Sequence, residues 1–407
     1  MNTVKKITQS IDYKILIATG ILVVLGLIAL YSATAHATTE QLKGNFLRQI
    51  WWVFIGIIML LIILFTPNRI FRQVSYGYYA ISVVLLILVL FIGKGRGSSR
   101  WIALGAFRFQ PAEFAKIAVL MALARFLSPQ DSIKINQWRQ IVISFAIGLI
   151  PVALVVQQPD LGTSLVFVAI LLPILYWAGL SPFTIFAIVA PIFCLIAAFH
   201  LVAFFLTMAA VVTILIFSGR RVIEIIAHFI LNVSVGILTP FLWNNLHNYQ
   251  QKRILTFLGL EVDPRGIGYQ LIQSKVAIGS GGLWGKGFFK GTQTQLRFLP
   301  AQHTDFIISV IGEEIGFIGI AIVLGLFIFI FLKGIRNAAS VHDKYTSILS
   351  VGSICVLAFH VIVNIGMSVG IMPITGLPLP FLSYGGSFLI TSFILLGFIL
   401  NASLQKP

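Results

Sequence analysis

Long apolar runs separated by short polar stretches recur along the whole chain. Examples are Ile15–Leu30, Ile50–Phe65, Ile81–Ile92 and Phe317–Leu332. Each is near the roughly 20 residues that carry a helix across the hydrocarbon core of a bilayer. Only helices and closed barrels satisfy every backbone polar group in lipid, and these runs are continuous rather than alternating. The pattern therefore predicts a bundle of membrane-spanning helices.

About twelve spans are predicted, so the expected fold is an all-α polytopic membrane helical bundle with one membrane domain over residues 1–407. The expected helices lie near residues 15–33, 49–65, 75–93, 112–127, 140–157, 161–179, 183–199, 201–217, 222–243, 306–332, 346–370 and 384–402. Few polar residues separate the three candidate spans between 183 and 243. Two helices there instead of three would place the termini on opposite sides of the membrane.

The composition agrees with this prediction. Of the 407 residues, 58% are hydrophobic and only 10% are charged, with a mean hydropathy of +0.99, whereas soluble domains are about a quarter charged. The net charge of +16 does not indicate nucleic acid, because the basic residues lie in loops between spans. An acidic lipid or a phosphate is the expected partner. Cys194 and Cys355 lie inside predicted spans and indicate neither a disulfide framework nor a metal site.

Basic residues favour one orientation in the membrane. An even number of spans puts both termini on one side, and the loops on that side carry most of the short basic clusters. The positive-inside rule makes this side cytoplasmic. The residues concerned are Lys5, Lys6, Lys14, Arg69, Arg72, Lys134, Arg139, Arg220, Arg221, Lys333, Arg336 and Lys344.

Two segments on the predicted outer side are also basic. The short loop 93–110 holds Lys94, Arg96, Arg100 and Arg108 without an acidic residue, together with Trp101 and several glycines. Glycine-rich backbone can bind phosphate through N–H groups, so this loop is expected to bind an anion. The alternative is a set of basic residues merely tolerated at the interface. The large outer loop 244–305 has a second glycine strip, 279–287, whose function the pattern alone does not name.

Charged residues inside spans are costly and are functional candidates for that reason. Glu113 and Lys116 lie three residues apart on one helical face. They either neutralise each other or line a polar path for a lipid headgroup. Asp160 precedes a predicted helix, where its carboxylate is expected to cap the helix.

The densest polar cluster is Gln302-His303-Thr304-Asp305, followed by Gly312-Glu313-Glu314. Asp305 precedes a long apolar helix. It could be the N-cap of that helix or a general base, and periodicity does not decide between these roles. The residues alone indicate an outward-facing polar chamber for an anionic amphiphile.

Four separated stretches resemble the SEDS family of RodA, FtsW and SpoVE proteins. They are Ser99-Arg100-Trp101-Ile102 with Gln110–Lys116, Gln158–Thr163, Gly268-Tyr269-Gln270 through Asp305-Phe306, and Asn364 through Ser387. They occur in family order and cover nearly the whole chain. The motif Gly291–Leu296 before Leu299-Pro300 is similar to that of the elongation-type members, such as RodA, rather than that of FtsW.

The chain departs from the family pattern in two places. The family usually has about ten spans, whereas this chain has three candidates within 182–243, so a helical hairpin is expected to be inserted there. Phe388 stands where the family signature usually has a small residue.

The resemblance implies a peptidoglycan glycosyltransferase that uses Lipid II at the outer face of the bacterial cytoplasmic membrane, for cell-wall elongation and cell shape. By residue match, Asp305 is the essential acid and is expected to deprotonate the acceptor hydroxyl. Arg100, Lys116 and Arg253 are the candidate cations for the pyrophosphate leaving group, and Trp101 offers a packing or sugar-stacking surface. Glu113 is expected to orient Lys116, and His303 and Thr304 either orient Asp305 or cap its helix. Gln158, Asp160, Gln270 and Ser383 are weaker candidates.

The resemblance also implies a partner, a class B penicillin-binding protein with transpeptidase activity. The resemblance leaves open a divalent cation between Asp305 and phosphate, although the sequence has no cluster of metal-binding residues. Two other functions stay open at this point. One is a Lipid II flippase without chemistry, and the other is a non-catalytic scaffold for the transpeptidase.

Overall fold

The computed structural model describes residues 11–35, 42, 44–93, 100–104, 107–128, 138–219, 221–246, 251, 255 and 267–404. The elements in chain order are α2 (Tyr13–Ala35), α4 (Asn45–Phe65), α5 (Asn68–Ile92), β1 (Ile102–Leu104), β2 (Phe107–Phe109), α6 (Pro111–Leu127), α7 (Trp138–Val156), α8 (Leu161–Trp177), α9 (Pro182–Ala197), α10 (Leu201–Phe217), α11 (Val222–Asn244), α13 (Ile267–Gly281), α14 (Thr292–Gln295), α15 (Ile307–Glu314), α16 (Gly316–Ala339), α17 (Lys344–Val369) and α18 (Gly386–Leu404).

The structure confirms a helical membrane protein. Within the described residues, 8 helices are long and apolar enough to cross a membrane, and α8, α9 and α10 are shorter apolar helices. The helix α6 is also short, and it carries Glu113 and Lys116. A small antiparallel hairpin of β1 and β2, with Ile102 opposite Phe109, lies within the predicted outer loop 93–110.

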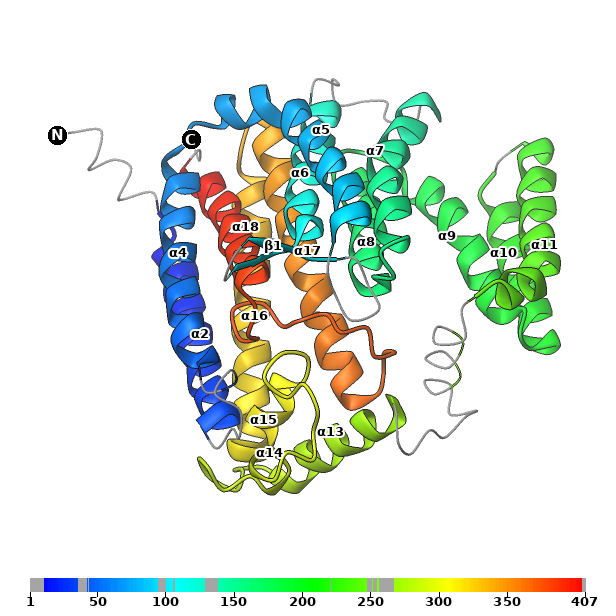
Figure 1. The fold of residues 1–407 in the computed structure, drawn as a ribbon. Helices are drawn as coiled ribbons and strands as arrows, with labels where there is room; N and C mark the ends of the chain where they lie inside the picture. Colours follow the sequence, from blue (N-terminus) through cyan, green and yellow to red (C-terminus); the bar gives the residue numbers. More distant parts are fainter. Residues whose placement is uncertain are drawn as a thin grey trace.

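Three helices form the centre of the bundle. Most residues of α6, α17 and α18 are buried, whereas α4 and α5 bury only a narrow face and expose apolar side chains such as Trp51 and Phe91. Figure 1 shows α17 and α18 surrounded by the other helices. In a membrane these outward apolar faces contact lipid, so their exposure needs no protein partner.

The helices α9, α10 and α11 form a group at the side of the bundle, at the right of Figure 1. They share a small core that includes Cys194, Met208 and Leu215, separate from the main core. The structure thus has three helices between 182 and 244, as expected. Their origin as an insertion stays a prediction.

Polar contacts identify the two ends of the bundle. At one end Lys333 lies 3.6 Å from Asp12, Arg72 lies 2.8 Å from Asp343, and the Asn401 amide donates to carbonyls at the end of α4. The chain enters α2 and leaves α18 at this end, which is uppermost in Figure 1. The opposite end holds α13, α14 and α15.

The predicted span 306–332 is wrong as a single helix. It divides into α15 and α16 at Ile315, followed by Gly316 with a φ of +81°. The chain at residues 281–287 wraps around this break. The N–H groups of Lys286 and Gly287 donate to the carbonyls of Glu313 and Glu314, and the N–H groups of Phe317 and Ile318 donate to residues 282 and 283. These bonds satisfy backbone groups that a helix end leaves unpaired.

The close approach at this break explains the glycine strip. A Cβ on Gly281 would lie 1.9 Å from the carbonyl oxygen of Gly312, and one on Gly285 would lie 2.2 Å from that of Glu314. Gly285 also has a φ of +78°. The strip is therefore a packing surface for the broken helix.

Residues 370–385, hereafter the re-entrant segment, connect α17 to α18 without regular structure. The carbonyl of Pro378 contacts His360, which precedes the end of α17 by nine residues, or roughly 14 Å of helix. A Cβ on Gly26, in the middle of α2, would lie 2.6 Å from Leu382 Cα. The segment therefore dips into the bundle, and burial in protein makes non-helical backbone tolerable at this depth.

Three glycine replacements test the strip. Gly285→Ala is expected to lower the melting temperature most, because it adds a clash to a left-handed backbone that alone costs about 1–3 kcal/mol. Gly282→Ala has a φ of +59° but open space, so it should show only the conformational cost. Gly279→Ala, in α13 with open space, should be neutral or stabilising. Thermal unfolding in detergent measures this order, and equal effects for Gly285→Ala and Gly282→Ala would contradict the packing role.

Candidate functional site

Asp305 lies where the outer loop turns into α15. Its N–H donates to the carbonyl of Ala301 at 3.0 Å, and its own carbonyl accepts from the Asn364 amide at 2.8 Å. The N-cap of α15 is Phe306, whose own side chain makes no cap bond, so the alternative of Asp305 as the N-cap residue is wrong. The backbone of Asp305 is held from two sides while its side chain is only half-buried.

The re-entrant segment packs directly against this turn. Ser383 donates its hydroxyl hydrogen to the carbonyl of Thr304 and accepts from the N–H of Leu379. The N–H of Tyr384 donates to the carbonyl of His303 at 3.0 Å. A Cβ on Gly376 would lie 3.5 Å from Asp305 Oδ2. The structure therefore brings His303, Thr304, Asp305 and Ser383 together.

His303 is a half-buried imidazole two residues before Asp305. Burial lowers its pKa from the ordinary value of 6.5, and the nearby positive charge of Arg297 lowers it further. A neutral imidazole is therefore favoured at neutral pH. Arg297 belongs to the basic outer loop and was not singled out from the sequence as a site residue.

Arg100 is bound to the turn before α8. Its guanidinium donates to the carbonyls of Gln158 and Pro159 and lies 3.7 Å from Asp160. Asp160 accepts from the N–H of Thr163 at 3.2 Å, which confirms the predicted helix cap. This turn touches the re-entrant segment, because a Cβ on Gly162 would lie 2.7 Å from the carbonyl oxygen of Thr375.

The structure places two further predicted residues, and others fall outside the described residues. Trp101 is half-buried just before β1, and Gln270 is half-buried in α13. Arg253 and the glycine-rich residues 94–99 fall outside the described residues. Their proposed binding roles stay predictions.

Glu113 and Lys116 form a fully enclosed ion pair in α6. The Lys116 ammonium lies 2.9 Å from the Glu113 carboxylate, and neither side chain reaches an open surface. The same ammonium lies 3.1 Å from Nε2 of His360 in α17. His360 is an ionisable residue inside a predicted span, and that signal in the sequence could have identified it.

Glu313 is a second buried carboxylate, and it holds the outer loop in place. It accepts from the N–H groups of Gln293 and Thr294 at the start of α14, and it lies 3.0 Å from the ammonium of Lys286. Burial raises its pKa, but these hydrogen bonds outweigh burial and hold the pKa below the ordinary value of 4.5. The carboxylate links α15, which is too short to span a membrane, to α14 and the glycine strip.

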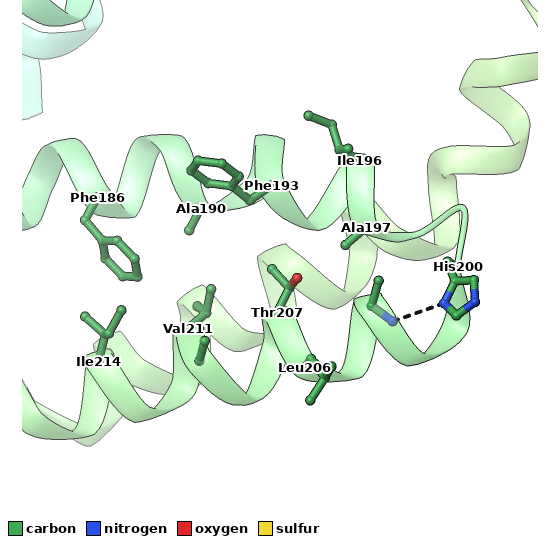
Figure 2. A pocket seen from close by; sticks show the side chains of 12 residues that line it. Phe186, Ala190, Phe193, Ile196, Ala197, His200, Leu206, Thr207, Val211 and Ile214 are labelled. Atoms are coloured by element: carbon green, nitrogen blue, oxygen red, sulfur yellow. Dashed lines mark hydrogen bonds between the residues drawn. The ribbon is translucent and has the colours of Figure 1, made fainter. Parts of the chain in front are cut away.

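A groove of about 640 Å³ lies far from this chemistry, between α9 and α10 (Figure 2). Its lining is apolar apart from His200 and Thr207, and Nδ1 of His200 accepts from the N–H of Ala203. Lipid chains suit such a surface. The functional site is therefore assigned to Asp305 and the re-entrant segment on their chemistry, not on cavity size.

The described part of the chain contains no group of three or more His, Cys, Asp or Glu side chains that could hold a metal ion. Asp305 offers a single carboxylate. Mg²⁺ is often bound by one or two carboxylates, substrate phosphates and water. Asp305 fits that kind of binding, and the divalent cation stays a prediction.

Comparison with known proteins gives consistent matches over the whole chain. The sequence model of the FtsW, RodA and SpoVE cell cycle proteins matches residues 13–209 and 203–407. The peptidoglycan glycosyltransferase RodA of Treponema pallidum (strain Nichols) is 33% identical, covering 97% of this chain and 98% of that protein. The peptidoglycan glycosyltransferase MrdB of Escherichia coli (strain K12) is 35% identical, covering 94% and 92%.

A solved structure of a peptidoglycan synthase complex, described as coordinating polymerization and crosslinking, contains a chain with a similar fold. It superposes with a TM-score of 0.71 at 28% identity and covers 97% of both chains.

Glu313→Gln tests the role of the buried carboxylate. The pKa of Glu313 is lower in the folded protein, so its stabilisation is present above about pH 4.5 and is lost as the pH falls through the folded pKa. The variant should lose about 1–3 kcal/mol at neutral pH and show a flatter melting profile in acid. Gln293→Ala is the control, because it leaves the bonded backbone N–H in place. A wild-type acid profile in Glu313→Gln would contradict this assignment.

Proposed function

Because the chain belongs to the FtsW, RodA and SpoVE family of cell cycle proteins, we propose that it is a peptidoglycan glycosyltransferase. It joins Lipid II units into β-1,4-linked glycan strands for cell-wall elongation and cell shape. The observation that carries the proposal is the position of Asp305. This carboxylate is half-buried and its backbone is fixed by Ala301 and Asn364. One of its carboxylate oxygens faces Gly376, where a Cβ would lie 3.5 Å from that oxygen.

In this reaction Asp305 acts as the general base. The acceptor hydroxyl oxygen bonds to the anomeric carbon of the lipid-linked donor, and its proton passes to the Asp305 carboxylate. The bond to undecaprenyl pyrophosphate breaks on the opposite face, which inverts the anomeric centre.

Cations near the site serve the pyrophosphate leaving group. Arg297 lies close enough to lower the pKa of His303, and the exposed Lys275 contacts Gly370 at the start of the re-entrant segment. Arg253 is retained as a further candidate. Lys116 is enclosed with Glu113, so its effect on the site is indirect and passes through the re-entrant segment. Arg100 acts by fixing the turn before α8.

The protein is proposed to lie in the bacterial cytoplasmic membrane with both termini in the cytoplasm. The end of the bundle where α2 begins and α18 ends carries Arg69, Arg72, Arg125, Lys333, Arg336 and Lys344 in its loops and helix ends. The positive-inside rule favours the cytoplasm for this end. Asp305 is then at the outer face.

A class B penicillin-binding protein, a transpeptidase, is the proposed partner. Support comes from the similar chain in a peptidoglycan synthase complex. Coupling the two enzymes would join strand synthesis to crosslinking.

Asp305→Asn tests the catalytic role in the purified chain bound to its transpeptidase partner. With Lipid II and moenomycin present, wild type should make glycan strands and Asp305→Asn should be slower by about 100- to 10,000-fold. Glu224→Gln, the same chemical change in α11, is the control and should polymerise normally. Electrophoresis of labelled glycan measures the rates, and size-exclusion chromatography measures complex assembly.

Other outcomes identify the alternatives. Full polymerisation by a folded, partner-bound Asp305→Asn would rule out the base assignment. Labelled Lipid II that crosses vesicles without polymer would indicate a flippase. Partner binding with neither activity would indicate a scaffold.

A further inference from the structure

A buried triad contacts the re-entrant segment at Pro378. Its members are Glu113 and Lys116 of α6 and His360 of α17, and all three side chains are enclosed. The Lys116 ammonium lies 2.9 Å from the Glu113 carboxylate and 3.1 Å from Nε2 of His360. The roles proposed above for the site do not involve His360.

The contacts of His360 determine its protonation. A lysine ammonium can only donate hydrogen bonds, so the facing Nε2 of His360 must be the acceptor. The single proton of the neutral ring is then on Nδ1, which lies 3.1 Å from the carbonyl oxygen of Pro378 and donates to it. His360 is therefore a neutral imidazole that connects the ion pair to the backbone of the re-entrant segment.

Asn364 holds the same segment one helical turn further along α17. Its amide donates to the carbonyl of Leu377 at 2.8 Å and to the carbonyl of Asp305 at 2.8 Å. Residues four apart share a helical face. One face of α17 thus fixes two consecutive carbonyls of the segment and also the backbone of the proposed base.

Phe388 covers the triad. Its ring lies 5.5 Å from the Lys116 ammonium and 4.7 Å from the ring of His360, and its side chain is 6% exposed. A ring at this place keeps water away, and hydrogen bonds and charge interactions are stronger in a low dielectric. The phenylalanine that departs from the family signature therefore has a defined packing role in this chain.

We propose that His360 is a positioning residue for Asp305, acting through the bond from Nδ1 to the carbonyl of Pro378. The triad anchors residues 376–378, and Gly376 of this stretch faces the carboxylate of Asp305. Loss of the anchor would let the segment shift relative to the base. The inference rests on the proposed glycosyl transfer and deepens the account of the same site.

Two conservative replacements separate the two nitrogens of His360. In His360→Asn the amide nitrogen can occupy the place of Nδ1 and still donate to Pro378, whereas in His360→Gln the amide lies near the place of Nε2. With Lipid II and the partner present, His360→Ala and His360→Gln should lower kcat by about 10- to 100-fold with little change in KM. His360→Asn should recover most of the rate.

Hydrogen exchange gives a readout that does not depend on activity. Backbone amides of residues 371–385 should exchange faster in His360→Ala and His360→Gln than in wild type or His360→Asn. Ser353→Ala is the matched control, because this buried hydroxyl in α17 bonds only to the carbonyl of Leu349 in its own helix. It should change neither rate nor exchange.

The results separate the two proposals. If wild type makes no polymer, the proposed function fails, and hydrogen exchange still decides whether His360 anchors the segment. If wild type polymerises and the Asn and Gln variants are equal in rate and exchange, the positioning role is wrong. If His360→Ala does not fold, the comparison of the Asn and Gln variants still tests the positioning role.

Discussion

Backbone N–H and C=O groups find no water in the core of a bilayer, and this constraint decides where the chain can leave helical form. It does so at two described places inside the bundle. At the break between α15 and α16, residues 282–287 supply the missing hydrogen bonds. Along the re-entrant segment, side chains of α17 supply them, through His360 and Asn364. Both devices allow irregular backbone to exist beside apolar helices.

The break lies at the C-terminal end of α15, and the turn that carries the Asp305 carboxylate lies at its N-terminal end. The re-entrant segment provides Gly376 and Ser383, which face or hold that turn. Hydrogen bonds to Glu313 hold the chain around the break, and the buried triad holds the re-entrant segment. A carboxylate placed in this way needs no rearrangement of its surroundings to react, which is the property that makes fixed polar groups effective in catalysis.

Much of this architecture could be predicted from local pattern. Apolar length predicted the spans, and the position of Asp160 before an apolar helix predicted its cap. The break at Ile315 could not be predicted, because the apolar run continues through it and the cause lies in glycines some thirty residues earlier. The start of α5 at Asn68 was also missed, because Asn68 and Arg72 bond to Thr346 and Asp343, which are distant in the sequence, at the start of α17. His303 and Asp305 are near neighbours in the sequence, but the contact of Ser383 with this turn was not predicted, because the family resemblance named Ser383 only as a weaker candidate.

The ion pair of Glu113 and Lys116 has one further consequence. A single charge that moves across a membrane potential of 100 mV changes its energy by about 2.3 kcal/mol. With its two opposite charges 2.9 Å apart and a neutral His360 beside them, the triad has no net charge and only a short dipole. The transmembrane voltage therefore exerts almost no net force on it. The anchor that the triad provides for the re-entrant segment is thus insensitive to the voltage across the membrane.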